Sequence, residues 1–242
     1  MAKPGRFRRA MTALKKLIAD KEDTKQVFII LEAMAGNSGL RSWRRFKKAA
    51  TAKAILSADR PLMAHLMDRE ALAAMPEGSL GRAYHRFTEL EQITADGLVD
   101  ASVEGREETR EMTPEQVIFH DRQRDAHDLW HVVTGYGRDP LGELSLLAVT
   151  WRQLGNPGIL MIIAMGYYVA RKESPELKIG AALREGFRRG KKGQWLPAAH
   201  WEELLPRPLN EVRAELGFAR PDKYRAVIAS AADLQTAGLP AE

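Results

Sequence analysis

Apolar residues recur along this chain with helical spacing, while runs that alternate apolar and polar residues, as half-buried strands do, are almost missing. Ala, Leu, Glu, Arg and Met, which favour helices, dominate the sequence. There is no internal repeat, and low complexity is confined to an alanine-rich tail after Ala226. The pattern therefore predicts an all-α fold, built as a single helical domain.

Capping residues place the ends of the predicted helices in the middle of the chain. The Thr-Pro-Glu segment 113–115 predicts the start of a long helix that reaches Val133. Gly135 and Gly137 are expected to end it, and the next helix is predicted over 141–154. Two consecutive helices joined by a short glycine-containing turn are thus expected here.

Three more helices are predicted, and none of them is long enough to span a membrane. Ser42 is expected to cap a helix that runs to about Leu56, and Ser174, with Pro175 behind it, to cap another. The most apolar run, 159–170, makes about 18 Å of helix against the ~30 Å of a bilayer core. We expect it to be a buried core helix or the lining of a lipid-tail cavity.

Composition restricts the chemistry, and charge divides the chain. The 242 residues include no cysteine, which excludes disulfide frameworks, thiolate metal sites, iron–sulfur clusters and cysteine nucleophiles. Residues 1–60 hold 15 Lys/Arg against 5 Asp/Glu, a net of +10, whereas residues 61–242 hold 22 against 27, a net of −5. Charge therefore distinguishes, within one domain, a basic N-terminal helical region (1–60) from the remainder of the chain.

One short segment carries residues suited to binding a metal. His127, Asp128 and His131 point at about 0°, 100° and 40° around a helix, so they face one sector. The turn lets the next helix fold back and bring Glu143 to the same sector. Two imidazoles and two carboxylates suit zinc, iron or manganese, in a site between two consecutive helices. An ordinary helix with Asp128 in solvent fits the same spacing equally well.

The remaining histidines offer less. His120, with Asp121, lies two turns before the motif, and it either extends the site or is an ordinary surface or core histidine. His65, His85 and His200 have no partners in sequence, and no role is assigned to them.

The metal motif lies in a segment that resembles the signature of a known family. The run 124–136 (RDAHDLWHVVTGY), continued as far as Glu143, contains His-Asp-x-x-His, eleven residues, then Glu. This is the hallmark of the Coq4 family of ubiquinone (coenzyme Q) biosynthesis proteins. The segment 75–84 (MPEGSLGRAY) resembles the family's Pro-x-Gly-x-Leu-Gly-x-x-Tyr block, and a third block lies within 201–213. The resemblance covers about residues 60–216, which implies a family-like helical core over 61–216 and a C-terminal extension over 217–242.

This resemblance implies a fold, a cofactor and a reaction. It implies an all-α protein with a divalent metal at His127, Asp128, His131 and Glu143, zinc being the metal usually attributed to the family. It also implies that the protein acts together with other ubiquinone-biosynthesis proteins. The implied substrate is a polyprenylated benzoate precursor, and the implied reaction replaces its C1 carboxyl by a hydroxyl. A metal can bind the substrate carboxylate and stabilise charge as CO2 departs. Zinc has no redox chemistry, so oxygen insertion needs direct reaction of the ring with O2, or iron instead.

Two other functions remain open. A non-catalytic, lipid-binding scaffold of the same complex, with a structural metal, also fits the motif. More remotely, the paired His-Asp motifs suggest an HD-type metal-dependent phosphohydrolase, which would need His65 or His85 and a late aspartate. Nucleic-acid binding is not expected, because the basic region lacks a stacking or groove-reading motif.

A polyprenylated substrate requires an apolar slot and a membrane nearby. The predicted slot lining is Leu144, Leu146, Leu147 and the run 159–170. The basic clusters 44–48 and 188–192 are predicted to touch anionic lipid headgroups, or else to be solvated helix faces. We expect a bacterial cytoplasmic protein, peripheral on the inner membrane, with the matrix side of the mitochondrial inner membrane as the alternative. A homodimer is compatible with this reading.

Overall fold

The computed structural model describes residues 5–20, 23–90 and 112–236, and the regular secondary structure among them is helical apart from one isolated bridge between Ser79 and Pro208. The all-α prediction is confirmed. The helices are α1 (Arg6–Ala19), α2 (Thr24–Met34), α3 (Ser38–Phe46), α4 (Ala52–Leu56), α5 (Leu62–Leu66), α6 (Arg69–Ala74), α7 (Leu80–Leu90), α9 (Pro114–Asp125), α10 (His127–Thr134), α11 (Pro140–Leu154), α12 (Pro157–Glu173), α13 (Ile179–Lys192), η1 (Leu196–Ala198), α14 (Trp201–Leu204), α15 (Leu209–Leu216) and α16 (Asp222–Thr236).

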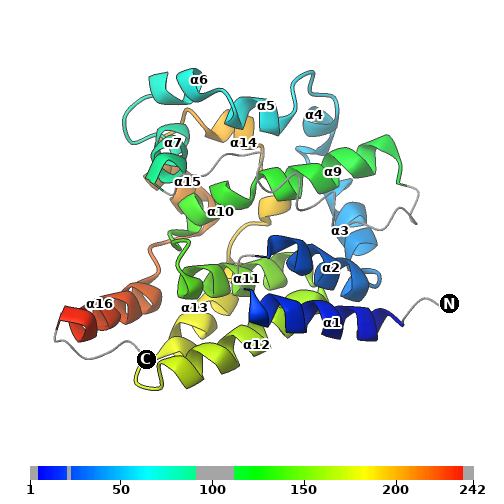
Figure 1. The fold of residues 1–242 in the computed structure, drawn as a ribbon. Coiled ribbons are helices and arrows are strands. Elements are labelled where there is room, and N and C mark those ends of the chain that lie inside the picture. The colour runs from blue at the N-terminus through cyan, green and yellow to red at the C-terminus, as the bar shows by residue number, and fades with distance from the viewer. Residues whose placement is uncertain (1–4, 21–22, 91–111, 237–242) are drawn as a thin grey trace.

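The helices form two layers (Figure 1). The lower layer contains α1, α2, α11, α12 and α13, and the upper layer contains α4 to α7, α9, α14 and α15. Helix α10 lies between the layers, where it contacts α7 and α15 on one side and α11 on the other. Its side chains Leu129, Trp130 and Val133 belong to the largest hydrophobic core. The segment that carries the histidine motif is therefore central to the molecule.

Helix α11 is held against α13 by close backbone contact. A Cβ atom on Gly186 would lie 2.6 Å from the carbonyl oxygen of Ser145, and one on Gly190 would lie 2.7 Å from that of Val149. Because no larger side chain fits at either position, the two helices approach more closely than helices with side chains between them. Helix α11, which begins near the motif, is therefore held in a fixed position against α13.

The predicted helix from Ser42 to about Leu56 is wrong in its boundaries, because two helices, α3 and α4, occupy this region. Ser42 does not cap a helix but lies buried inside α3. On one straight helix Phe46 and Ile55 would be about 900° apart and face opposite sides. The turn between α3 and α4 lets both side chains join Phe119 in a single hydrophobic cluster.

Two further boundaries differ from the prediction. Ser174 ends α12 rather than starting the next helix, and α13 begins at Ile179. In the segment between them, the guanidinium of Arg171 donates to Pro175 O at 2.7 Å and to Leu177 O at 3.4 Å. The long helix expected to reach Val133 is divided into α9 and α10 at Ala126, whose ψ of −2° departs from helical values.

Helix α12 contains the apolar run 159–170 but buries only one of its sides. Ile159, Ile162 and Ile163 are buried, whereas Leu160 and Tyr168 on the outer side are 38% and 65% exposed. The prediction of a buried core helix is therefore wrong for that outer side. Within the described residues, no helix combines the length and the apolar character needed to cross a membrane.

Candidate metal centre

The end of α10, the start of α11 and the turn between them form the framework of the site. Gly135 ends α10 in the left-handed region, with φ of 74°, and its N–H donates to His131 O at 2.8 Å. Asp139 caps α11, because its Oδ1 accepts hydrogen bonds from Leu141 N and Gly142 N at 3.1 and 3.0 Å. Glu143 therefore projects from the first turn of α11, as the sequence predicts.

Two arginines from distant helices fix the carboxyl end of α10. Arg213 donates to Val132 O and Val133 O at 2.7 and 3.1 Å, and Arg189 donates to Thr134 O at 2.7 Å. The last carbonyl groups of a helix have no partners within it and carry partial negative charge, so guanidinium groups stabilise them. The helix that presents the motif is thereby anchored just beyond His131.

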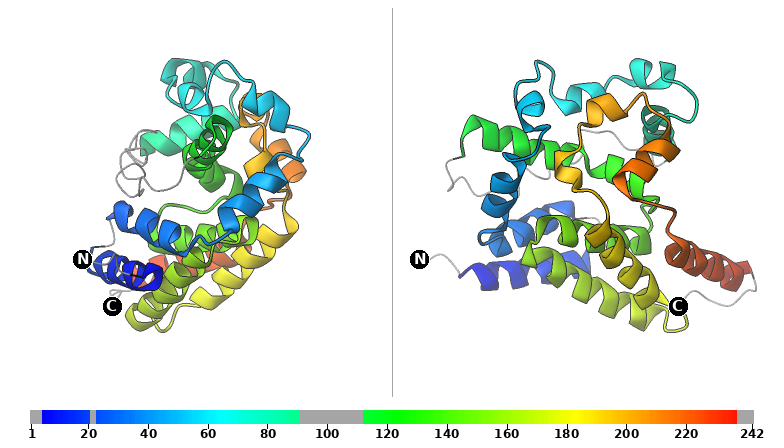
Figure 2. Two further views of the ribbon diagram at one scale, coloured as in Figure 1. Left: turned by 90° about the vertical axis from the view of Figure 1, so that its right-hand side faces the viewer. Right: turned by 180° about the vertical axis from the view of Figure 1, so that it is seen from behind.

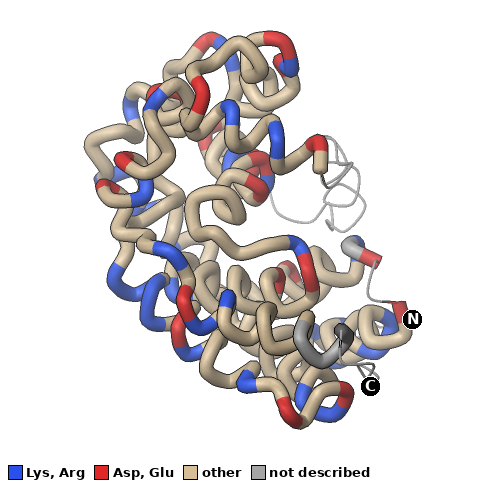
Figure 3. The backbone as a smooth tube through the Cα atoms, turned by 90° about the vertical axis from the view of Figure 1, so that its left-hand side faces the viewer, with Lys and Arg blue, Asp and Glu red and all other residues tan. Residues whose placement is uncertain are grey.

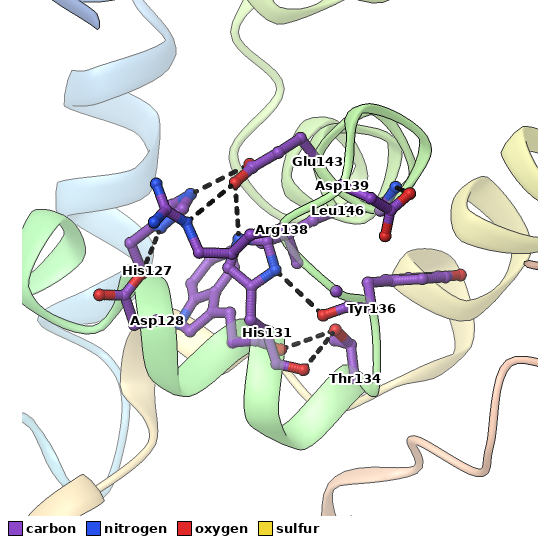
Figure 4. A network of polar contacts seen from close by, with 12 residues as sticks. His127, Asp128, His131, Thr134, Tyr136, Arg138, Asp139, Glu143 and Leu146 are labelled. Atoms are coloured by element: carbon purple, nitrogen blue, oxygen red, sulfur yellow. Dashed lines mark hydrogen bonds and ion pairs between the residues drawn. The ribbon is translucent and has the colours of Figure 1, made fainter. Parts of the chain in front are cut away.

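The four predicted side chains lie close together (Figure 4). His127, Asp128 and His131 each offer a ligand atom, and these atoms lie within 4.8 Å of one another. Glu143 approaches from α11, with Oε1 3.4 Å from His131 Nε2 and Oε2 4.0 Å from His127 Nε2. His131 is fully buried, whereas the side chains of His127 and Glu143 are 36% and 34% exposed, so the cluster opens on one side.

The hydrogen bonds of the two histidines leave their Nε2 atoms for another partner. His131 Nδ1 lies 3.1 Å from the carbonyl oxygen of Tyr136, which can only accept, so Nδ1 carries the proton. His127 Nδ1 is likewise 3.1 Å from Asp128 Oδ1. The buried Nε2 of His131 has no hydrogen-bond partner. A lone pair at Nε2, with Nδ1–H bonded to a carbonyl or carboxylate, is the usual state of a metal-binding histidine.

The charges in the cluster support one another. Burial favours a higher pKa for Asp128 and Glu143, but the neighbouring histidines and Arg138 outweigh it, and the pKa of each carboxyl falls below its usual value. Burial alone would lower the pKa of His127, but its hydrogen bond to Asp128 and the charges of Asp128 and Glu143 raise it overall. The residues thus present ionised carboxylates beside imidazole nitrogens, which is a donor set that fits a divalent cation.

Sequence reasoning missed three residues at this site. Arg138 lies in the turn, with Nε 3.6 Å from Glu143 Oε1 and a side chain 35% exposed. Phe87 stacks on the ring of His131, with centroids 5.7 Å apart, and the backbone of Tyr136 fixes the His131 proton. The turn position of Arg138 was visible in the sequence, but nothing there pointed its side chain toward Glu143.

The other histidines lie apart from the cluster. Among the described residues, the group that could hold a metal contains His127, Asp128 and His131 but not His120. His120 instead lies near α3, where a Cβ on Gly39 would be 3.5 Å from its ring. His85 pairs with Glu89 on its own helix at 3.2 Å. These positions do not support the second His-Asp pair that a phosphohydrolase site would require.

One predicted lipid contact is corrected by burial. In the cluster 188–192, Arg189 is only 8% exposed and donates to the end of α10, so it does not reach a membrane. Leu144 and Leu146, predicted to line a slot, are buried in two hydrophobic clusters, and their slot role stays a prediction. A surface cavity of about 760 Å³ lies elsewhere, beside α3 and η1, and Trp195 contributes to its wall.

The fold and the site thus define an all-helical protein with a histidine–carboxylate cluster between two consecutive helices. Residues 7–222 match the family model for the coenzyme Q (ubiquinone) biosynthesis protein Coq4. Because this match covers most of the chain, the chain belongs to the Coq4 family, as its sequence motifs indicate.

Individual relatives agree with this assignment, and a solved structure shares the fold. The COQ4 homologue 1 of Culex quinquefasciatus is 31% identical over 185 residues, which cover 76% of this chain and 64% of that protein. The mouse COQ4 homologue is 26% identical over 159 residues, covering 65% and 57% of the two chains. The alignments thus span about three-fifths of these relatives, both of which are named as mitochondrial. A putative ubiquinone biosynthesis protein from Nostoc punctiforme has the same fold, with a TM-score of 0.62, 22% identity and coverage of 87% and 97%.

Proposed function

We propose that this protein catalyses a metal-dependent oxidative decarboxylation in ubiquinone biosynthesis. The C1 carboxyl of a polyprenylated benzoate precursor would leave as CO2, and a hydroxyl from water would take its place. Dioxygen would accept the two electrons released and leave as hydrogen peroxide. The observation that carries this proposal is the buried Nε2 of His131, which makes no hydrogen bond and faces Glu143 Oε1 at 3.4 Å beside a second histidine. A structural role alone does not require the cluster to open toward solvent at His127 and Glu143.

The chain's own residues would divide the work. The Nε2 atoms of His127 and His131 and the carboxylate of Glu143 would hold the metal, and Asp128 would orient His127 or add a fourth ligand. When bound, the metal supplies positive charge that stabilises the negative charge developing on the ring as CO2 departs. Zinc follows from the family resemblance, and iron or manganese suits the same donors.

Arg138 would bind the carboxylate of the substrate. Its guanidinium lies at the open side of the cluster and contacts Glu143 at 3.6 Å. With Glu143 serving as a metal ligand, the Arg138 guanidinium would be available to a second carboxylate. Guanidinium binds carboxylate with two parallel hydrogen bonds, which would hold the C1 carboxyl in a fixed orientation beside the metal.

Membrane contact would occur through α1 and the outer side of α12. Both helices lie at the bottom of the molecule in Figure 1 and remain neighbours in Figure 2. Phe7 and Ile18 on α1 are 64% and 41% exposed, and Leu160 and Tyr168 are exposed on α12. Figure 3 shows both basic and acidic segments beside the N label, but α1 itself contains Lys and Arg and no acidic residue. Exposed apolar side chains flanked by basic ones suit an anionic lipid surface.

A complementation experiment tests the catalytic role. A strain that lacks this protein would receive wild type, Glu143→Gln, or the exposed control Glu176→Gln, and its quinone intermediates would be profiled. We expect Glu143→Gln to accumulate a C1-carboxylated precursor, while the control restores ubiquinone. Full restoration by Glu143→Gln would refute catalysis and favour the scaffold. Metal analysis of the purified protein identifies the ion, and cross-linking in cells would test the proposed contact with other ubiquinone-biosynthesis proteins and the predicted homodimer.

A further inference from the structure

The C-terminal helix α16 contacts the turn that builds the candidate metal centre. The hydroxyl of Tyr224, in the first turn of α16, donates a hydrogen bond to Asp139 Oδ2 and accepts one from Gly137 N at 3.0 Å. A Cβ on Gly137 would lie 2.8 Å from this hydroxyl, so only glycine allows the approach. One side chain, more than eighty positions away in sequence, therefore holds two groups of the Gly135–Asp139 turn.

Tyr224 is itself held in place. The carboxylate of Glu185 on α13 accepts hydrogen bonds from the backbone N–H groups of Lys223 and Tyr224, at 3.0 and 3.2 Å. The ring of Tyr224 packs edge-on against that of Tyr136, with centroids 5.2 Å apart, and the residue is 7% exposed. A carboxylate at the amino end of a helix is also favoured by the helix dipole. The hydroxyl is therefore presented to the turn from a rigid position.

The Gly135–Asp139 turn connects the Tyr224 hydroxyl to the metal centre by two routes. Asp139 accepts from Tyr224 with Oδ2 and caps α11 with Oδ1, so the same carboxylate fixes the start of the helix that carries Glu143. Tyr136, next to Gly137, supplies the carbonyl oxygen that fixes the proton on His131. A shift of the turn would thus move Glu143 relative to His131 and change the direction of its Nε2 lone pair.

We propose that Tyr224 is a positioning residue for the metal centre, which it reaches through Asp139 and the Gly135–Asp139 turn. The inference rests on the proposed function, because it requires that the cluster bind a metal. The match to the family model ends at residue 222, where α16 begins, so family membership itself says nothing about Tyr224. Groups that orient metal ligands contribute about 10- to 100-fold to metal affinity.

Cobalt titration of the full-length protein tests the proposal. Cobalt(II) affinity and its absorption spectrum would be measured for wild type, Tyr224→Phe, Asp139→Asn and the double variant. The matched control is Tyr167→Phe, which removes the hydroxyl of a tyrosine on the exposed side of α12. Unfolding temperature and hydrogen–deuterium exchange of the peptide that spans 134–143 would be recorded on the same metal-free samples. Asp139→Asn keeps the packing of Tyr224, so it serves the same test if Tyr224→Phe folds poorly.

We expect Tyr224→Phe to bind cobalt about 10- to 100-fold more weakly, with an altered spectrum and faster exchange of the turn. Tyr167→Phe should match wild type. The double variant should lose less than the sum of the two single losses, because both substitutions remove the hydrogen bond between Tyr224 and Asp139. Unchanged affinity in Tyr224→Phe, with cobalt bound by wild type, would overturn the positioning role and leave the metal centre standing. No cobalt binding by wild type would overturn the metal centre, and the role of Tyr224 with it.

Discussion

Replacing Asp128 with asparagine tests whether this carboxylate orients the neighbouring histidine. Asp128 Oδ1 accepts the hydrogen bond from His127 Nδ1 at 3.1 Å, and the residue is 7% exposed. Asparagine has nearly the same shape and can place an oxygen at the same position, but it carries no charge. The substitution should therefore keep the packing of α10 and weaken the hold on His127.

The expected size of the effect follows from this geometry. A carboxylate that orients a metal-binding histidine contributes about 10- to 100-fold to affinity, or about 1.4–2.7 kcal/mol. At a metal concentration 100 times the wild-type Kd, binding stabilises the wild type by about 2.7 kcal/mol, but a variant with 100-fold weaker binding by only about 0.4 kcal/mol. For a chain of this length, that difference corresponds to about 5–9 °C in unfolding temperature.

Two measurements check this prediction of orientation by Asp128. Chelator competition gives the zinc affinity, and thermal unfolding with and without zinc gives the stabilisation, each for wild type, Asp128→Asn and the exposed control Asp59→Asn. The control should match wild type in both. Equal zinc affinity in Asp128→Asn and wild type would refute the orienting role, whereas a loss well beyond 100-fold would make Asp128 a direct ligand.

Three further predictions concern other parts of the molecule. Arg122→Met should lower the free energy of unfolding, measured by denaturant titration, by about 3–5 kcal/mol. The substitution leaves the buried carboxylate of Glu202 without its ion-pair partner. Burial favours a higher pKa for the Glu202 carboxyl, but its bonds to Arg122 outweigh burial, and the pKa falls below its usual value. The pair therefore stabilises the fold above about pH 4.5 and loses this contribution as the pH falls. If the stability of Arg122→Met depended on acid pH as that of wild type does, this reasoning would be contradicted. Arg138→Met should leave zinc affinity within about threefold of wild type, since an exposed contact at 3.6 Å does little to hold Glu143 in position. The C1-carboxylated precursor should nevertheless accumulate in cells that carry this variant, and a normal quinone profile would rule out substrate carboxylate binding by Arg138. Phe7→Glu should reduce sedimentation with vesicles of about 30% anionic lipid, because it places a negative charge among the basic residues of α1, and undiminished sedimentation would exclude this face.

The parts of the fold that the sequence predicts are those set by local interactions. Thr113 caps α9 in a capping box with Gln116, and Gly135 ends α10, because both effects act within one turn of helix. The break at 47–51 could not be predicted in this way, because it depends on packing against another helix. It lets Phe46 and Ile55 join Phe119 in one hydrophobic cluster. Helical periodicity describes one helix at a time and does not reveal which neighbour the helix must meet.

The same distinction applies to the candidate site. The spacing of His127, Asp128 and His131 is a local property, and the glycine-containing turn predicts the return of the next helix. By contrast, the proton on His131 depends on a backbone carbonyl, and the side chain that fixes the turn belongs to Tyr224. A backbone carbonyl group is present at every residue, so the sequence does not show which one accepts a hydrogen bond. A contact between residues more than eighty positions apart produces no periodic pattern that could predict it.

A metal centre of this kind requires donors that are fixed before the ion arrives, because ordering them at the time of binding would cost affinity. The short motif supplies the donor atoms, but the ends of α10 and α11 are fixed from elsewhere: by Arg189 and Arg213 at the last carbonyl groups of α10, and by Tyr224 at the cap of α11. All three lie after residue 185 in the chain. It follows that His-Asp-x-x-His and the later Glu, transplanted onto another helical pair, should bind metal weakly unless those distant contacts are transplanted too.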